Sequence, residues 1–431
     1  MKLTKLLAYV TLATSATFAL TACSSDKSDG GKTTIEFMTT STEKERQDNI
    51  NEMIKAFESK NKHIDVKLVP VEEDALNTKV VTLARAKKLP AVIEVSQDYA
   101  KVMDQQELTD NKSASEVIKN IGEDNYYDGA LNLVRNEDGK DFIAAPISGW
   151  VQGIWYNKSQ IKDAGFNAPE SWDDILKISK HFTDQGNKKY GIALPTVDGT
   201  FSEQAFSQFA LSNGANVLDK DGKVTIDTKE MEEALSFYKE LYQYALPGSN
   251  DTTEVNDAFM NGTAPMAMYS TYILPGAFEA DKASNIGFAI PKKEDSAVYG
   301  TVSALSITNG LEDSQKEAAK KFVEYMSEPE QVESWTLMSP MGAQPVNKKV
   351  VESKTYKENE TVKAYGDLST DIAGSFDKVQ VFGLVGDKNF KSMGTITSSG
   401  AIGKAVYQVT VKDGDVKEAL KTAQKSAESA E

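Results

Sequence analysis

Strand and helix patterns alternate regularly along the chain after residue 32, and this alternation restricts the fold more than any other feature. Residues 33–40 (TTIEFMTT) are rich in β-branched side chains, as is typical of a strand. The apolar residues of 50–57 recur with the period of one helix face. A second strand is predicted at 64–71, a helix at about 72–87 and a third strand at 89–95. Strands separated by helices predict parallel pairing in an α/β sheet.

The second half of the chain repeats this alternation. Strands are predicted at 145–157 (APISGWVQGIWYN), 264–270 and 299–310. Three pairs of polar residues, spaced as in helix-capping boxes, predict helix starts between and after these strands. The pairs are Ser171 with Asp174, Asp227 with Glu230, and Ser314 with Glu317.

The N-terminal segment has the layout of a secretory signal. Two lysines precede a largely apolar stretch at 6–20, which is too short to span a bilayer comfortably as a helix. Residues 20–22 (Leu-Thr-Ala) precede Cys23, the one cysteine of the chain, and resemble the lipobox of bacterial lipoproteins. We therefore expect residues 1–22 to be a lipoprotein signal peptide and Cys23 to be the lipidated first residue of the mature protein.

Residues 23–32 are expected to form a flexible tether. After the cysteine they read SSDKSDGGK and contain no apolar side chain, so burial cannot offset the entropy lost on ordering them. The net charge of −16 becomes −18 when residues 1–22, with two lysines and no acidic residue, are removed. This charge disfavours binding to nucleic acid or to anionic lipid. We expect the lipid to hold the protein on the extracytoplasmic face of a bacterial cell membrane.

Motifs for catalysis, metals and cofactors are missing from the sequence. His63 and His181 are its two histidines, and they form neither an HExxH motif nor a local Ser/His pair. SSGAIGK at 398–404 lacks the first glycine of a phosphate-binding loop and is interpreted as a helix start. The acidic residues of 218–227 do not have EF-hand spacing, and their Asp-Gly step favours a hairpin turn. We expect no catalytic residue, no metal site and no cofactor.

Four stretches together resemble the family 1 extracellular solute-binding proteins, the receptors of ABC importers that include maltose-binding protein. They are AFESKNKHIDVKL (56–68), WYNKSQIKDAGFNAPESWDDI (155–175), DAFMNGTAPMAM (257–268) and KKFVEYMSEPEQVESW (320–335). The resemblance covers nearly the whole mature chain. It implies two α/β lobes, each with a mainly parallel sheet flanked by helices, joined by a hinge that the chain crosses several times.

Carried onto this sequence, the resemblance places hinge crossings near 145–146, 291–299 and 344–346. The expected lobe one is 33–145 plus 295–344, and lobe two is 146–294 plus 345–431. The implied function is a membrane-anchored extracytoplasmic receptor. It would bind a sugar or oligosaccharide between its lobes as a monomer, close, and deliver the ligand to the permease subunits of an ABC transporter.

A sugar has an apolar C–H face and a rim of hydroxyls, so its site needs flat aromatics together with fixed polar groups. Candidates lie beside the first crossing, at the end of the 264–270 strand, in the loop after the first strand, at the end of the third strand, and in the DGTFSEQ loop. The predicted ligand-binding residues are Trp150, Tyr272, Asp98, Glu43, Gln97, Tyr99, Ser41 and Phe201. Trp155, Trp172 and Trp335 lie inside the motifs of the fold, and we expect them in the core.

Two other functions are compatible with the sequence. The same fold could bind a non-sugar solute such as a glycerol phosphate, a polyamine or a metal ion, and the acidic Glu43 and Asp98 would suit a cation better than a phosphate. A surface glycoside hydrolase would need two carboxylates flanking a glycosidic bond. Among 64 acidic residues some pair always fits that description, so this signal has little specificity.

Overall fold

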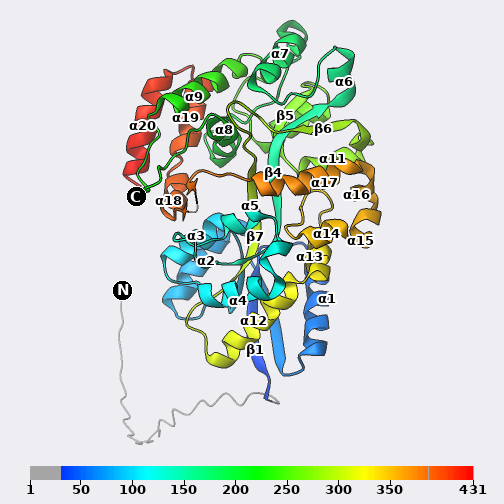
Figure 1. Cartoon of the computed structure of the whole chain (residues 1–431), viewed down its shortest axis with the longest axis vertical. Coiled ribbons are helices and arrows are strands. Elements are labelled where there is room, and N and C mark those ends of the chain that lie inside the picture. The colour runs from blue at the N-terminus through cyan, green and yellow to red at the C-terminus, as the bar shows by residue number, and fades with distance from the viewer. Residues whose placement is uncertain (1–30, 387, 431) are drawn as a thin grey trace, which may run out of the picture.

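Nine strands and twenty α-helices lie within the residues described by the computed structural model, 31–386 and 388–430 (Figure 1). The strands are β1 (Thr33–Thr39), β2 (Ile64–Pro70), β3 (Val92–Ser96), β4 (Ala145–Asn157), β5 (Met266–Ser270), β6 (Ile286–Ala289), β7 (Tyr299–Ile307), β8 (Leu384–Val385) and β9 (Lys388–Asn389). The first ten helices are α1 (Lys44–Lys60), α2 (Glu73–Arg85), α3 (Gln97–Gln105), α4 (Asn111–Ile121), α5 (Asp128–Leu133), α6 (Lys158–Asp163), α7 (Trp172–Phe182), α8 (Thr200–Ser212), α9 (Lys229–Tyr242) and α10 (Thr252–Met260). The others are α11 (Ile273–Glu279), α12 (Asp313–Ser327), α13 (Pro329–Thr336), α14 (Lys348–Glu352), α15 (Lys354–Glu358), α16 (Glu360–Tyr365), α17 (Asp367–Gly374), α18 (Ser392–Ser399), α19 (Ala401–Thr410) and α20 (Val416–Glu428).

The predicted order of strands and helices at the start of the chain is confirmed. β1 pairs in parallel with both β2 and β3, and α1 and α2 make the crossovers. The four apolar residues that predicted α1 are all buried. With α3, α4 and α12 these elements form the lower lobe in Figure 1.

The long strand β4 leads from this lobe into the second one. A single seven-stranded sheet has the order β2-β1-β3-β7-β4-β5, and β6 also pairs with β4. β7 pairs with the first half of β4, and β6 pairs with its last four residues. Two neighbouring strands thus connect the lobes, so the lobes can rotate through a few backbone dihedrals.

The two-lobed α/β architecture is confirmed, but the expectation of mainly parallel sheets is corrected to a mixed sheet. Among the described strands of this sheet, β1 pairs in parallel with β2 and β3, whereas β3–β7, β7–β4, β4–β5 and β4–β6 are antiparallel. The order of helices and strands in a sequence does not specify which edge of a sheet a later strand joins, or in which direction. β5 and β6 join β4 from opposite sides and run against it.

Two of the three predicted helix starts are corrected at the cap. Ser171 caps α7 as predicted, accepting a hydrogen bond from the Asp174 backbone N–H at 3.1 Å. α9 is capped by Thr228 rather than Asp227, and α12 follows Glu312 without a side-chain cap. The helices themselves are present, because their buried apolar faces stabilise them more than any cap does.

Two clusters of buried apolar residues stabilise the fold. The larger one runs from β1, α1 and α12 along the sheet to β5 and α11, and the second lies among α7, α8, α9, α19 and α20. Trp155 and Trp335 are buried in the first cluster and Trp172 in the second, which confirms the prediction that these rings pack in the core. The expected lobe boundaries stay a prediction.

Candidate functional site

A cavity of about 570 Å³ lies where the two lobes face each other. The first lobe contributes the segments after β1 and β3 and the starts of α1, α2 and α3. The second contributes the side chain of Trp150 on β4, Gln204 on α8, and the end of α18 with Thr397 and Ser398. Because both lobes supply its walls, a ligand in this cavity would contact both of them.

Five of the eight predicted ligand-binding residues line this cavity. They are Glu43, Asp98, Tyr99, Trp150 and Tyr272. They come from four separate stretches of the first 272 residues, since Asp98 and Tyr99 are neighbours on α3, so tertiary folding brings them together.

The other three predicted residues lie beside the cavity. Gln97 is fully buried, and its Oε1 accepts hydrogen bonds from the Thr301 hydroxyl and from the Val302 backbone N–H at 2.8 Å. Ser41, in the segment between β1 and α1, is buried. Phe201 packs edge-to-face on Tyr269 with ring centroids 5.6 Å apart. In this structure they support the walls, and their contact with a ligand stays a prediction.

Trp150 presents a half-buried indole to the cavity. Its backbone pairs with Thr301 across β4 and β7, so its position is determined by the sheet. Its ring packs on Tyr299 at 5.6 Å between centroids, tilted by 42°. Burial raises the pKa of the Tyr299 hydroxyl well above its usual value, so this hydroxyl stays protonated and can donate a hydrogen bond.

Tyr272 lies just after β5, where the chain turns into α11. It is 44% exposed and is the exposed large hydrophobic side chain among the described residues. It lines the cavity together with Arg46 and Glu43 from the first lobe. The Arg46 Nε atom lies 3.9 Å from Glu43 Oε2.

Glu94 forms a buried carboxylate in the cavity wall on the side of the first lobe. The Thr39 hydroxyl donates to it, and so does the Ser303 hydroxyl at 2.8 Å. Burial raises its pKa, and these hydrogen bonds only partly oppose that rise. A carboxyl group held in this way can accept hydrogen bonds from ligand hydroxyls.

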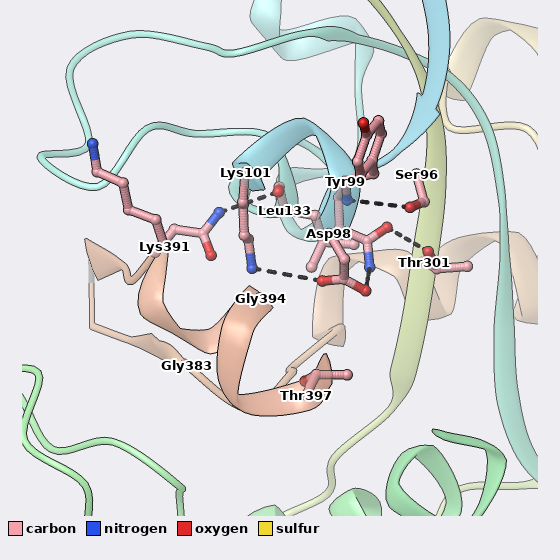
Figure 2. A network of polar contacts seen from close by, with 12 residues as sticks. Ser96, Asp98, Tyr99, Lys101, Leu133, Thr301, Gly383, Lys391, Gly394 and Thr397 are labelled. Carbon is pink, nitrogen blue, oxygen red and sulfur yellow. Dashed lines mark hydrogen bonds and ion pairs between the residues drawn. The ribbon is translucent and has the colours of Figure 1, made fainter. Parts of the chain in front are cut away.

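Asp98 and Lys101 form a pair on the first turns of α3, pointing toward α18 of the second lobe (Figure 2). Asp98 Oδ1 lies 3.9 Å from Lys101 Nζ, and Gln97 donates to Asp98 Oδ2 at 3.3 Å. Ser96 caps α3 by accepting from the Tyr99 N–H at 3.3 Å. Burial lowers the pKa of Lys101, and the Asp98 charge partly opposes this.

Glu203 on α8 is a second buried carboxyl, and it lies on the second-lobe side of the cavity. The Thr397 hydroxyl on α18 donates to Glu203 Oε1 at 2.7 Å. Burial raises the pKa of Glu203 to about 7, and the negative charge of Asp98 adds to the rise. This carboxyl therefore titrates near neutral pH.

Several cavity residues were not predicted from the sequence. Glu94 carried a usable signal, because it is an acidic residue inside the apolar run LPAVIEV. Burying a carboxyl group in a strand is costly, so such a residue is expected to have hydrogen-bond partners or a function. Arg46, Gln204, Thr301 and Thr397 carried none, since they are ordinary polar residues of helices and strands that folding brings to the cavity.

The described part of the chain offers neither a metal-binding cluster nor a membrane-spanning helix. Residues 31–386 and 388–430 contain no group of three or more His, Cys, Asp or Glu side chains arranged to hold a metal ion. Within the same ranges, every helix is too short or too polar to cross a membrane. Cys23 and the signal at 1–22 lie outside the described residues.

Comparison with known proteins identifies relatives over most of the chain. The chain is 50% identical over 391 residues to the Escherichia coli (strain K12) protein named "Putative ABC transporter periplasmic-binding protein YcjN", covering 91% of each chain. It is 26% identical to the "Multiple sugar-binding protein" of Streptococcus mutans over 72% of this chain and 75% of that one.

A solved structure shares the fold. The sugar-binding protein MalE of Xanthomonas citri superposes with a TM-score of 0.76 at 18% identity, covering 92% of this chain and 97% of that one. The two-lobed periplasmic-binding-protein fold is thereby confirmed. The family model described as bacterial extracellular solute-binding protein matches residues 40–333. With a cavity between two lobes and relatives over nearly its whole length, the chain belongs to the bacterial extracellular solute-binding proteins that serve ABC transporters.

Proposed function

We propose that this protein is a membrane-anchored receptor that binds a sugar or oligosaccharide between its lobes, closes, and delivers it to an ABC permease. The observation that carries the proposal is the composition of the cavity wall. It combines the exposed faces of Trp150 and Tyr272 with hydroxyl, amide and carboxylate groups from both lobes. Rings match the C–H face of a sugar, and the polar groups match its hydroxyls.

The charges along the cavity favour a ligand without negative charge. Among the described residues, Glu43, Glu73, Glu94 and Asp98 line it, against the single lining cation Arg46. Carboxylates accept hydrogen bonds from sugar hydroxyls, whereas a phosphate or uronate would be repelled by them. A glycerol phosphate is therefore a poorer candidate than a neutral saccharide.

The Streptococcus mutans relative supports this ligand class through its name, since it is called a multiple sugar-binding protein. At 26% identity this relationship does not specify which sugar binds here. The contacts that Trp150 and Tyr272 make with the ligand would determine which sugar is bound.

The anchor in this proposal comes from the sequence. Cys23 after Leu-Thr-Ala would carry the lipid, and residues 24–32 would link it to β1. Thioether-linked diacylglycerol provides two acyl chains, enough for stable attachment where a single chain binds only marginally. The tether would keep a monomeric receptor close to its permease and raise their effective concentration.

A thermal-shift screen tests the proposed ligand class. Purified protein is heated with a panel of neutral mono- and oligosaccharides, with spermidine as a cationic comparison and glycerol 3-phosphate as an anionic one. A ligand at 100 times its Kd stabilises the folded protein by about 2.7 kcal/mol, which raises the Tm. We expect at least one neutral sugar to raise it. Stabilisation by spermidine or glycerol 3-phosphate alone would refute the sugar proposal.

The best sugar is then incubated with the protein and recovered. We expect it intact, as a receptor does not break glycosidic bonds. Monosaccharides released with the protein but not in a control incubation without it would instead identify a glycoside hydrolase.

A further inference from the structure

A buried asparagine connects the lobes next to the ligand cavity. Asn389, at the end of β9, is 2% exposed. Its Nδ2 donates to three backbone carbonyls, those of Asn132 at 3.3 Å, Leu133 at 3.1 Å and Arg135 at 3.0 Å. One amide group thus bonds three carbonyls at and just beyond the end of α5, and the Asn132 carbonyl also accepts from the Arg135 N–H at 3.4 Å.

The two sides of this contact are attached to different lobes. Asn216 holds the β8–β9 hairpin, accepting from the Gly383 N–H at 3.0 Å and donating to the Leu384 carbonyl at 3.2 Å. Phe390 is buried in the cluster among α7, α8, α9, α19 and α20. The hairpin is therefore part of the second lobe.

The carbonyls belong to the segment before β4, which is attached to the first lobe. Arg135 Nη2 lies 3.5 Å from Glu123 Oε2, and the Ser115 hydroxyl on α4 accepts from the Phe142 N–H at 2.9 Å. The hydrogen bonds of Asn389 therefore run from one lobe to the other.

Lys391 adds a second contact in the same place. Its Nζ lies 3.7 Å from Asp104 Oδ2 on α3, and its backbone N–H donates to Glu137 Oε2 at 3.4 Å. Figure 2 shows Lys391 and Gly394 at the start of α18, facing α3. A Cβ atom on Gly394 would lie 3.3 Å from Val102 Cγ2, so α18 and α3 pack closely here and a larger residue would require Val102 to shift slightly.

Neither Asn389 nor Lys391 lines the ligand cavity. Their contacts with the first lobe are made between protein groups, so no ligand atom is needed to complete them. They join the lobes in the arrangement seen here, which we call the closed arrangement because the cavity has walls from both lobes.

We propose that Asn389 and Lys391 form an interlobe clasp that stabilises the closed arrangement without ligand and so sets the ligand affinity from outside the cavity. The consequence for affinity rests on the proposed receptor function. If only the closed arrangement has the complete site, the apparent Kd equals the intrinsic Kd divided by the closed fraction. Asn389 is then an affinity-determining residue that never touches the ligand.

The test measures the lobe arrangement directly and needs no ligand. Spin labels are attached in the Cys23→Ser background to Lys55→Cys on α1 and Lys177→Cys on α7, both exposed positions, one on each lobe. Pulsed electron resonance then gives the distribution of distances between them. We expect a short-distance, closed population in the otherwise unchanged chain. Asn389→Ala should reduce its ratio to the long-distance population about tenfold or more, because the interlobe hydrogen bonds of the Asn389 amide are lost.

Two further variants separate a clasp from a general loss of stability. Lys391→Met keeps the length of the side chain, and we expect a smaller shift in the same direction, as part-exposed ion pairs are weak. Asn250→Ala is the matched control, since Asn250 is also 2% exposed but donates to the Leu246 carbonyl at 2.7 Å within the second lobe. It should lower the Tm without changing the distances.

Two results would overturn the clasp. One is a distance distribution that is the same with Asn389 and with alanine at this position. The other is the lack of any short-distance population in the labelled protein that keeps Asn389 and Lys391, since the clasp would then be too weak to hold the lobes together. Because no ligand is added, either result leaves the proposed sugar specificity untouched, and a failed sugar screen leaves the clasp untouched.

Discussion

Replacing Trp150 by alanine separates a sugar-binding platform from a core residue more sharply than any other substitution. The indole lines the cavity, packs on Tyr299 at 5.6 Å between centroids, and is only half-buried. The backbone of alanine keeps the pairing with Thr301, so the variant should fold with β4 and β7 intact.

The expected cost to stability follows from this partial burial. Truncating a fully buried Phe or Trp to alanine costs about 3–5 kcal/mol. A half-buried ring should lose about half of that, roughly 2 kcal/mol, of which the contact with Tyr299 accounts for about 0.5–1.5 kcal/mol. Truncating a central aromatic anchor costs about 2–4 kcal/mol of binding, so the Kd of the best sugar should rise about 30- to 1000-fold.

The assay pairs two measurements on each variant. Calorimetric titration gives the Kd for the best sugar from the screen, and denaturant unfolding without ligand gives the stability. Trp155→Ala is the matched control, because Trp155 is fully buried, donates to the Tyr269 carbonyl at 2.7 Å and does not line the cavity. It should lose about 3–5 kcal/mol of stability while its folded fraction binds normally.

Two outcomes would refute the role of Trp150. Normal sugar affinity in Trp150→Ala would show that the ring does not contact the ligand. A loss of stability as large as that of the Trp155 variant would show that Trp150 is a core residue. In either case Tyr272, with its exposed ring, would become the leading platform.

Three further predictions concern pH, closure and anchoring. Burial raises the pKa of Glu203 to about 7 from 4.5, so the folded state binds this proton more tightly than the unfolded chain. The unfolding free energy should therefore fall by up to about 3 kcal/mol as the pH rises from about 4.5 to about 7, and Glu203→Gln should remove this contribution in denaturant titrations across that range. A ligand that contacts both lobes should lower the radius of gyration seen by small-angle scattering at saturation, and an unchanged curve would contradict ligand-driven closure. Cys23→Ala should release folded protein from the membrane fraction, and a variant that stays bound would exclude lipidation as the anchor.

Local patterns in the sequence predicted much of the fold. The spacing of Ile50, Met53, Ile54 and Phe57 predicted the buried face of α1, and the first three strands form as expected. These predictions succeed because helix and strand periodicity reflects which side of one element is buried, and that information lies within about a dozen residues. The motifs at 155–175 and 320–335 likewise separated the core tryptophans from Trp150.

Strand direction and most of the cavity came only from the tertiary structure. β5 and β6 pair against β4, although their own sequences look like any buried strand. Asn389 and Leu133 are 256 residues apart, yet their hydrogen bond connects the lobes. An ordinary asparagine or arginine carries no local signal of its partners, because they are chosen by how distant elements pack. The sequence alone therefore determined the elements, the family and the aromatic candidates, whereas packing decided which polar groups share the cavity and which ones hold the lobes together.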